Sequence, residues 1–190
     1  MQSLTYYVAA SADGYIAGPD GQFDFFHFDG DLAEWIIEEY PETLPVHARA
    51  ALGISERDNR HFGTVIMGRR TYQPALDAGI TSPYPHLRQF VCSTTFTSKD
   101  QDVEVVAADP AGRVRELKNT DGAGIWLAGG GNLAGELRTE IDELVIKRNP
   151  IVLGAGTPLV DGSFAPQPFD RISSRTFDSG VVVEIYRRPK

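Results

Sequence analysis

The sequence has 190 residues, with 26 acidic and 18 basic side chains and a formal net charge of -8. No basic tail or basic amphipathic stretch occurs, which argues against a nucleic-acid or membrane-surface binder and confines anion binding to a local site. A single cysteine, Cys92, excludes an internal disulfide. The sequence shows neither a secretory leader nor an apolar run of membrane length, so we expect one cytoplasmic domain over residues 1–190.

The chain opens with an apolar stretch, Leu4–Ala10, that predicts a central strand. A loop rich in glycine follows over 11–21, and its Asp13 is either a functional acid or a turn former. Next, four phenylalanines lie within residues 23–28. Such an apolar run beside a loop indicates core or the wall of a pocket for a flat ligand, with Phe25 and Phe26 as candidates.

Residues 31–40 have the mixed apolar and acidic pattern of a helix, with Trp35 on its apolar side and Pro41 ending it. Asp31 stands where an N-cap is expected. A second helix is predicted around 46–54. The histidines of the following excursion lack metal-ligand spacing, so we predict no metal site.

Two arginines follow the strand predicted at Thr64–Gly68 and open a helix. The first turn of a helix carries partial positive charge, so Arg69 and Arg70 are unfavourable there unless an anion lies opposite. The alternative is that they are solvated or pair with carboxylates. We favour the anion, because helix starts after a strand and a glycine are common anion sites.

Three more strands are predicted at 89–93, 103–107 and from Ile125 onward. The first ends in the hydroxyls of Ser93 and Thr94. Between the second and third, Asp109 as N-cap and Pro110 at the first helical position predict a crossover helix to residue 117.

The strand from Ile125 runs directly into Gly129, Gly130 and Gly131, and a helical pattern follows. Glycines leave no Cβ between the backbone and a ligand, and the first N–H groups of the helix have no partner within it. This order is typical of a phosphate cradle. A purely steric need for glycine in a tight strand-to-helix turn remains the alternative.

The remaining residues predict a strand over 143–151, an ordinary glycine-rich turn over 153–159, and a hairpin of strands 174–177 and 181–188. Alternating strands and helices closed by a hairpin predict an α/β fold: a mainly parallel central sheet flanked by helices, with an antiparallel C-terminal hairpin. Ligands of such sheets lie at the carboxyl ends of the strands, where the glycines, arginines and hydroxyls are expected.

Several blocks of the sequence, in order, resemble the dihydrofolate-reductase-like fold, and more specifically the reductase domain of riboflavin biosynthesis and its stand-alone relatives. The matching blocks cover nearly the whole chain and comprise residues 9–18, 65–72, 90–94, 127–133, 141–145 and 150–158.

The resemblance implies an NADPH site. It assigns the nicotinamide end to Ala10 and Ile16, and the 2′-phosphate with part of the pyrophosphate to four residues: Gly68, Arg69, Arg70 and Thr71. It places Ser93 and Thr94 on the adenosine side, and the rest of the pyrophosphate against residues Gly129, Gly130, Gly131, Asn132 and Leu133. It also implies a homodimer. An arginine pair at a helix start suits a dianionic phosphate, which favours NADPH over NADH.

Two departures limit the prediction of the substrate. The first loop lacks the Pro-Trp element of dihydrofolate reductases, and Asp31, although followed by Leu-Ala, is read as a plain N-cap rather than a pterin-binding carboxylate. The zinc-ligand pattern of the riboflavin deaminase domain is absent, as is a recognisable ribose-phosphate grip.

The leading hypothesis is an NADPH-dependent reductase that transfers hydride to a C=N or C=O group of a small pterin-, pyrimidine- or flavin-like molecule. Phe25, Phe26 and Trp35 are predicted to hold this substrate, and Asp13, then Asp31, are the candidate acids. Two alternatives stay open: a nucleotide- or flavin-binding module without turnover, and a true riboflavin-pathway or folate reductase. No nucleic-acid or membrane partner is expected.

Overall fold

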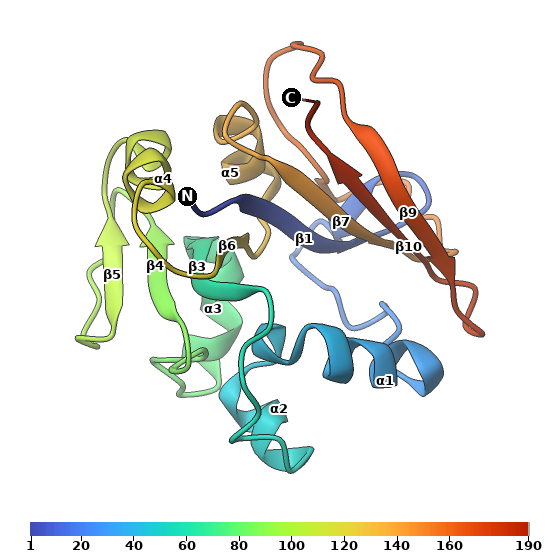
Figure 1. Cartoon of the computed structure of the whole chain (residues 1–190), viewed down its shortest axis with the longest axis horizontal. Helices are drawn as coiled ribbons and strands as arrows, with labels where there is room; N and C mark the ends of the chain where they lie inside the picture. Colours follow the sequence, from blue (N-terminus) through green and yellow to red (C-terminus); the bar gives the residue numbers. More distant parts are fainter. Residues whose placement is uncertain (190) are drawn as a thin grey trace.

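The computed structural model describes residues 1–189 and is built on one eight-stranded sheet (Figure 1). The sheet order is β5-β4-β3-β6-β1-β7-β10-β9. Six neighbouring strands run parallel: β5 (Val103–Val106), β4 (Arg88–Cys92), β3 (Phe62–Gly68), β6 (Gly124–Leu127), β1 (Leu4–Ala10) and β7 (Glu143–Arg148). The predicted mainly parallel sheet is confirmed.

An antiparallel hairpin completes the sheet. Its strands are β9 (Asp170–Thr176) and β10 (Val182–Arg187), and β10 pairs with β7. The hairpin was predicted, but β9 begins four residues earlier than expected. Every residue of β9 is exposed, and Ile172 is its one apolar residue. The segment therefore lacks the alternation of apolar and polar residues by which strands are recognised.

Helices cover both faces of the sheet (Figure 1). One face carries α1 (Gly30–Glu39), a 3₁₀ turn at Pro41–Thr43, α2 (Val46–Ala51) and α3 (Arg69–Asp77). The other carries α4 (Pro110–Lys118) and α5 (Gly131–Glu136). Asp109 caps α4 as predicted, since its Oδ1 accepts from the Gly112 N–H at 2.8 Å.

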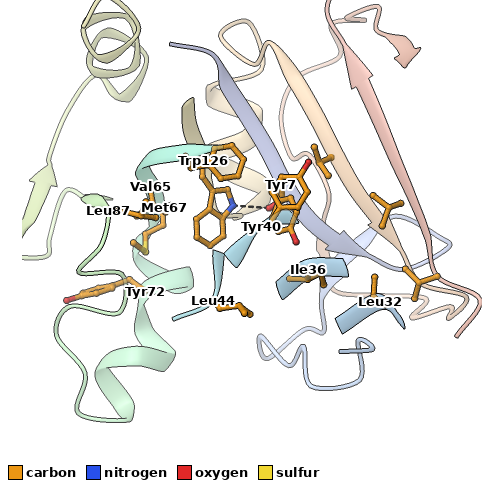
Figure 2. Close-up of a cluster of buried hydrophobic side chains, with 14 of the residues drawn as sticks. Tyr7, Leu32, Ile36, Tyr40, Leu44, Val65, Met67, Tyr72, Leu87 and Trp126 are labelled. Atoms are coloured by element: carbon orange, nitrogen blue, oxygen red, sulfur yellow. Dashed lines mark hydrogen bonds between the residues drawn. The ribbon is translucent and has the colours of Figure 1, made fainter. Parts of the chain in front are cut away.

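The core on the α1 side is aromatic. Tyr7 of β1 packs against Tyr40 with ring centroids 4.7 Å apart, and the indole Nε1 of Trp126 donates to the Tyr7 carbonyl at 3.1 Å. Figure 2 shows these rings together with Leu32 and Ile36 of α1. Leu32 and Ile36 of α1 and the buried residues of the central strands therefore join the helix to the sheet.

A second, two-stranded sheet was not predicted. It pairs β2 (Tyr15–Ala17), inside the first loop, with β8 (Thr157–Pro158). The pairing joins segments about 140 residues apart in the sequence and includes a proline, so no local pattern indicates it. No helix within residues 1–189 has the length and apolar character needed to cross a membrane.

Gly135 of α5 lies against the backbone of Asp161, so a substitution of this glycine tests how closely α5 packs against that segment. A Cβ built at Gly135 would stand 1.7 Å from the Asp161 carbonyl oxygen. We predict that Gly135→Ala lowers the free energy of unfolding by about 2 kcal/mol and the melting temperature by about 5 °C.

The matched control is Gly63→Ala in β3, where the nearest atom to a new Cβ lies 3.5 Å away. Thermal unfolding followed by circular dichroism compares the two variants. Equal melting temperatures would show that the segment around Asp161 moves freely.

Candidate cofactor and substrate site

The two predicted anion-binding turns meet at one place. Strands β3 and β6 are neighbours, and each is followed directly by a helix start, that of α3 or of α5. A Cβ built at Gly130 would lie 3.6 Å from Thr71 Oγ1, and one at Gly129 would lie 3.9 Å from the same atom. The first turn of α3 and the glycine turn therefore form a single site at the carboxyl edge of the sheet.

The three consecutive glycines have different reasons to be glycine. Gly129 and Gly130 have φ angles of +124° and +94°, which side chains strongly disfavour. A Cβ at Gly131 would stand 2.2 Å from the Pro158 carbonyl oxygen. Gly131 is thus explained by packing against β8, whereas Gly129 and Gly130 shape the turn that faces Thr71.

Arg69 is the first residue of α3 and is partly buried. Its guanidinium carbon lies 4.7 Å from the centroid of the Phe96 ring, and its Nη1 is buried without a hydrogen-bond partner among residues 1–189. No carboxylate of these residues pairs with Arg69 or Arg70. Arg70 is exposed, so the solvated alternative describes Arg70 but not Arg69.

The hydroxyl turn after β4 positions Phe96. Ser93 Oγ accepts from the backbone N–H groups of Thr95 at 3.3 Å and Phe96 at 3.1 Å, while Thr94 is exposed. Phe96 then lies over Arg69 and also contacts Tyr72, with ring centroids 5.5 Å apart. Sequence reasoning missed Phe96; an aromatic residue just after a hydroxyl turn was the available signal.

Asp13 fastens the first loop to the loop after β7. Its carboxylate accepts from Ser11 Oγ at 2.6 Å, and from the N–H groups of Leu153 and Gly154 at 3.1 and 2.7 Å. These hydrogen bonds, first that from Ser11, lower the pKa of Asp13 to about 2. A carboxylate ionised at neutral pH does not suit the proton donor predicted for Asp13; its contacts assign it to holding the loop.

Asp31 is not the N-cap of α1. The helix starts at Gly30, with Asp29 in the cap position, and Asp31 lies in the first turn. Both carboxylate oxygens of Asp31 lie 3.2 Å from the backbone nitrogen of Asp178, in the turn between β9 and β10, and accept its N–H. The N-cap prediction was wrong because the helix already begins at Gly30. The contact that holds Asp31 spans 147 residues, so no local pattern indicates it. As a proton donor, Asp31 stays a prediction.

The aromatic candidates occupy two places. Phe25 and Phe26 contact each other edge to face, with centroids 4.8 Å apart, and both are partly buried. Trp35 packs instead against Tyr40 and Phe177, at 5.3 and 5.5 Å. It lines a groove of about 380 Å³ between α1 and the hairpin. The structure therefore pairs the two phenylalanines and sets Trp35 apart from them.

Ala10 and Ile16 lie at the opening of the first loop. Ala10 is fully buried, and its carbonyl accepts from the Asn149 N–H at 2.7 Å. Ile16, in β2, packs against the core cluster of α4 and α5. Buried Asn149, which sequence reasoning missed, also accepts from the His27 N–H and so joins the end of β7 to the aromatic run.

This strand order, with a glycine turn facing a helix start, defines a dihydrofolate-reductase-like α/β fold. Dihydrofolate reductase from Enterococcus faecalis, solved in complex with NADP(H) and RAB-propyl, superposes with a TM-score of 0.67 over 99% of this chain and 97% of that chain. At 15% identity the likeness shows the fold alone.

The chain belongs to the RibD C-terminal domain family, whose model matches residues 2–183. A crystal structure of a "putative riboflavin biosynthesis protein" from Shewanella sp. PV-4 has a TM-score of 0.71 and 26% identity, covering 99% of both chains. The uncharacterized protein YwjB of Bacillus subtilis (strain 168) is 31% identical over 80% of this chain and 79% of its own length. The resemblance predicted from the sequence blocks is confirmed.

We predict that Asp13→Ala releases the first loop. Loss of the carboxylate leaves the N–H groups of Leu153 and Gly154 without their acceptor, so their amide hydrogen exchange should accelerate at least about tenfold. Asp20→Ala, in the same loop but without contact to residues 153–154, is the control. Unchanged exchange at Gly154 in Asp13→Ala would refute the fastening role.

Proposed function

We propose that this chain is an NADPH-dependent reductase that transfers a hydride to a C=N or C=O group of a small molecule. The observation that carries the proposal is the buried Arg69 Nη1, which has no partner among residues 1–189, in the same helix turn whose Thr71 faces Gly129 and Gly130. A buried guanidinium N–H without an acceptor is costly, and a bound phosphate oxygen supplies that acceptor.

The residues of the site fit this cofactor. Arg69, Arg70 and Thr71, together with Gly68, would hold the 2′-phosphate and part of the pyrophosphate. The glycine turn admits the rest of the pyrophosphate, because any Cβ at Gly130 would occupy the space next to Thr71. The turn of Ser93 and Thr94 flanks the adenosine side.

The substrate would lie where the first loop meets the sheet. Ala10 and Ile16 bound the nicotinamide end, and Phe25 with Phe26 offers an aromatic wall to a flat pterin-, pyrimidine- or flavin-like ring. Bound NADPH supplies the hydride. The chain binds and orients both molecules and excludes water, and Asp13 keeps the first loop fastened over the site.

The relatives support this reading at the level of class. The chain matches the RibD C-terminal domain model, a solved relative is described as a putative riboflavin biosynthesis protein, and the fold is shared with a dihydrofolate reductase solved with NADP(H). A Thermotoga maritima deaminase/5-amino-6-(5-phosphoribosylamino)uracil reductase also shares the fold, with a TM-score of 0.67 at 14% identity. This chain spans 57% of that protein.

Our first test is direct cofactor binding to the wild-type protein, measured by the fluorescence of the reduced nicotinamide. We predict that NADPH binds more tightly than NADH, and that Arg69→Ala weakens NADPH about 10- to 100-fold while changing NADH little. Arg57→Ala, a surface arginine paired with Glu38, is the control. Equal losses for both cofactors would remove the phosphate assignment.

A second prediction concerns the glycine turn. Gly130→Val places a branched side chain beside Thr71 Oγ1, so both NADPH and NADH should bind at least about tenfold more weakly. Gly79→Val also places a side chain at a positive φ, +76°, but faces open space. Comparing cofactor affinities of the two variants separates a blocked site from general strain; unchanged affinity in Gly130→Val would count against the role of the turn.

Turnover separates a reductase from a binding module. Loss of reduced-nicotinamide absorbance on adding a dihydropterin, an aminopyrimidine carbonyl compound or a flavin identifies the reductase. Tight NADPH binding without oxidation by any of these classes would favour the module.

A further inference from the structure

Lys147 lies on β7 at the carboxyl end of β1, where it pairs with Ala9 next to Ala10 of the proposed nicotinamide end. On the α1 face of the sheet, Tyr7 of β1 pairs with Val145 of β7 and contacts Trp126 of β6 edge to face, and all three are buried. Two residues further along, at the carboxyl edge, stand Ala9, Ala128 and Lys147, and all three keep part of their surface exposed. Lys147 therefore belongs to the partly exposed layer at the carboxyl edge of the sheet, with β1 between it and the strand that leads into the glycine turn.

The ammonium of Lys147 is held by an aromatic ring. Its Nζ lies 3.4 Å from the centroid of the Tyr7 ring, whose packing against Tyr40 is visible in Figure 2. No ion pair to Lys147 occurs among residues 1–189, whereas Lys118 pairs with Asp142 at 2.7 Å. The ring attracts a cation but does not neutralise it.

The charged groups on the surrounding elements are engaged elsewhere. Burial raises the pKa of both Tyr7 and Tyr40, so their rings stay neutral. The remaining groups contact other residues: Glu143 with Arg187, Glu184 with Arg148, Asp31 with the Asp178 N–H, Glu42 through Oε1 with the N–H groups of His61 and Phe62, and Arg175 with the Phe177 ring. Glu42 Oε2 is buried without a hydrogen-bond partner among residues 1–189. Desolvation by burial therefore dominates and lowers the pKa of Lys147 to about 7.

We propose that Lys147 is the proton-holding group of the reacting centre, facing the nicotinamide end of the cofactor and the substrate beside it. This inference rests on the proposed NADPH-dependent reduction. Asp13 is committed to the loop after β7, so a different group must supply the proton.

The step balances in atoms and charge. The substrate carbon accepts the hydride, and the π electrons of its C=N or C=O bond move to the nitrogen or oxygen. That atom takes a proton from Lys147 Nζ, giving an amine or an alcohol while NADPH becomes NADP⁺. The neutral Lys147 amine then regains a proton from water.

The test uses NADPH and NADP⁺ as probes and needs no substrate. The oxidised nicotinamide ring is positive and the reduced ring is neutral, while the phosphates are the same in both. A protonated Lys147 therefore repels NADP⁺ only. In the wild type, the ratio of the NADP⁺ to the NADPH dissociation constant should rise on the order of tenfold from about pH 8.5 to about pH 5.5.

Substitutions of Lys147 give distinct profiles. Lys147→Met, which holds no charge, should give a low ratio at every pH. Lys147→Arg, which stays charged, should give a high ratio at every pH. Lys118→Met removes a lysine paired with Asp142 and should keep the wild-type profile. The ¹³Cε signal of Lys147, one of four lysines in the sequence, reports its pKa directly, which should fall on binding NADP⁺ but not NADPH.

The outcomes separate this inference from the proposed function. If neither cofactor binds, the proposed function fails. If both bind and the wild-type ratio is as flat with pH as that of Lys147→Met, only the placement of Lys147 fails.

Turnover with a substrate from the screen tests whether Lys147 donates the proton. The wild-type kcat should fall as pH rises through about 7. Lys147→Met should abolish that pH dependence and leave the NADPH affinity unchanged. A wild-type profile in Lys147→Met would overturn the role, and bound NADPH without turnover would overturn both proposals.

Discussion

The site depends on the close approach of the glycine turn to the first turn of α3. A Cβ at Gly130 would already stand at contact distance from Thr71 Oγ1, and the positive φ angles of Gly129 and Gly130 disfavour any side chain. The parallel pairing of β3 and β6 causes this approach, because it brings both helix starts to one edge. Arg69, the first residue of α3, keeps a buried N–H without a partner among residues 1–189 at this edge, although the chain carries a net charge of -8.

The opposite side of the site is held by hydrogen bonds to one carboxylate. Asp13 collects the N–H groups of Leu153 and Gly154, and β2 pairs with β8 a few residues further on. The glycine-rich stretch after β7 therefore uses its amides within the protein, in agreement with its interpretation as an ordinary turn. β8 also approaches Gly131 through the Pro158 carbonyl. The glycine turn and the first loop are consequently parts of one connected framework.

Local patterns predicted most of the fold and the two turns, after β3 and β6, that the structure brings together. The six parallel strands, the capped helix α4 and the order of glycines and arginines all follow from periodicity, capping and turn chemistry. Long-range contacts decided the rest. Two contacts join segments far apart in the sequence: the bond of Asp31 to the Asp178 N–H and the β2–β8 pair. A third, the packing of Trp35 against Phe177, draws Trp35 away from Phe25. The position of Lys147 could not be predicted for the same reason. Its sequence neighbours Arg148 and Asn149 indicate an exposed strand end, whereas the residues that surround it come from β1.

The contact at Gly135 has a consequence for how relatives of this chain can diverge. The Asp161 carbonyl occupies the space that a Cβ at position 135 requires, and the Asp161 N–H donates to the Gly131 carbonyl at 2.9 Å. The segment from β8 to Gly162 therefore follows a groove that only small residues on α5 leave open. A homologue with a larger residue at position 135 must route that segment differently, so residue size there and the length of the segment should covary across the family.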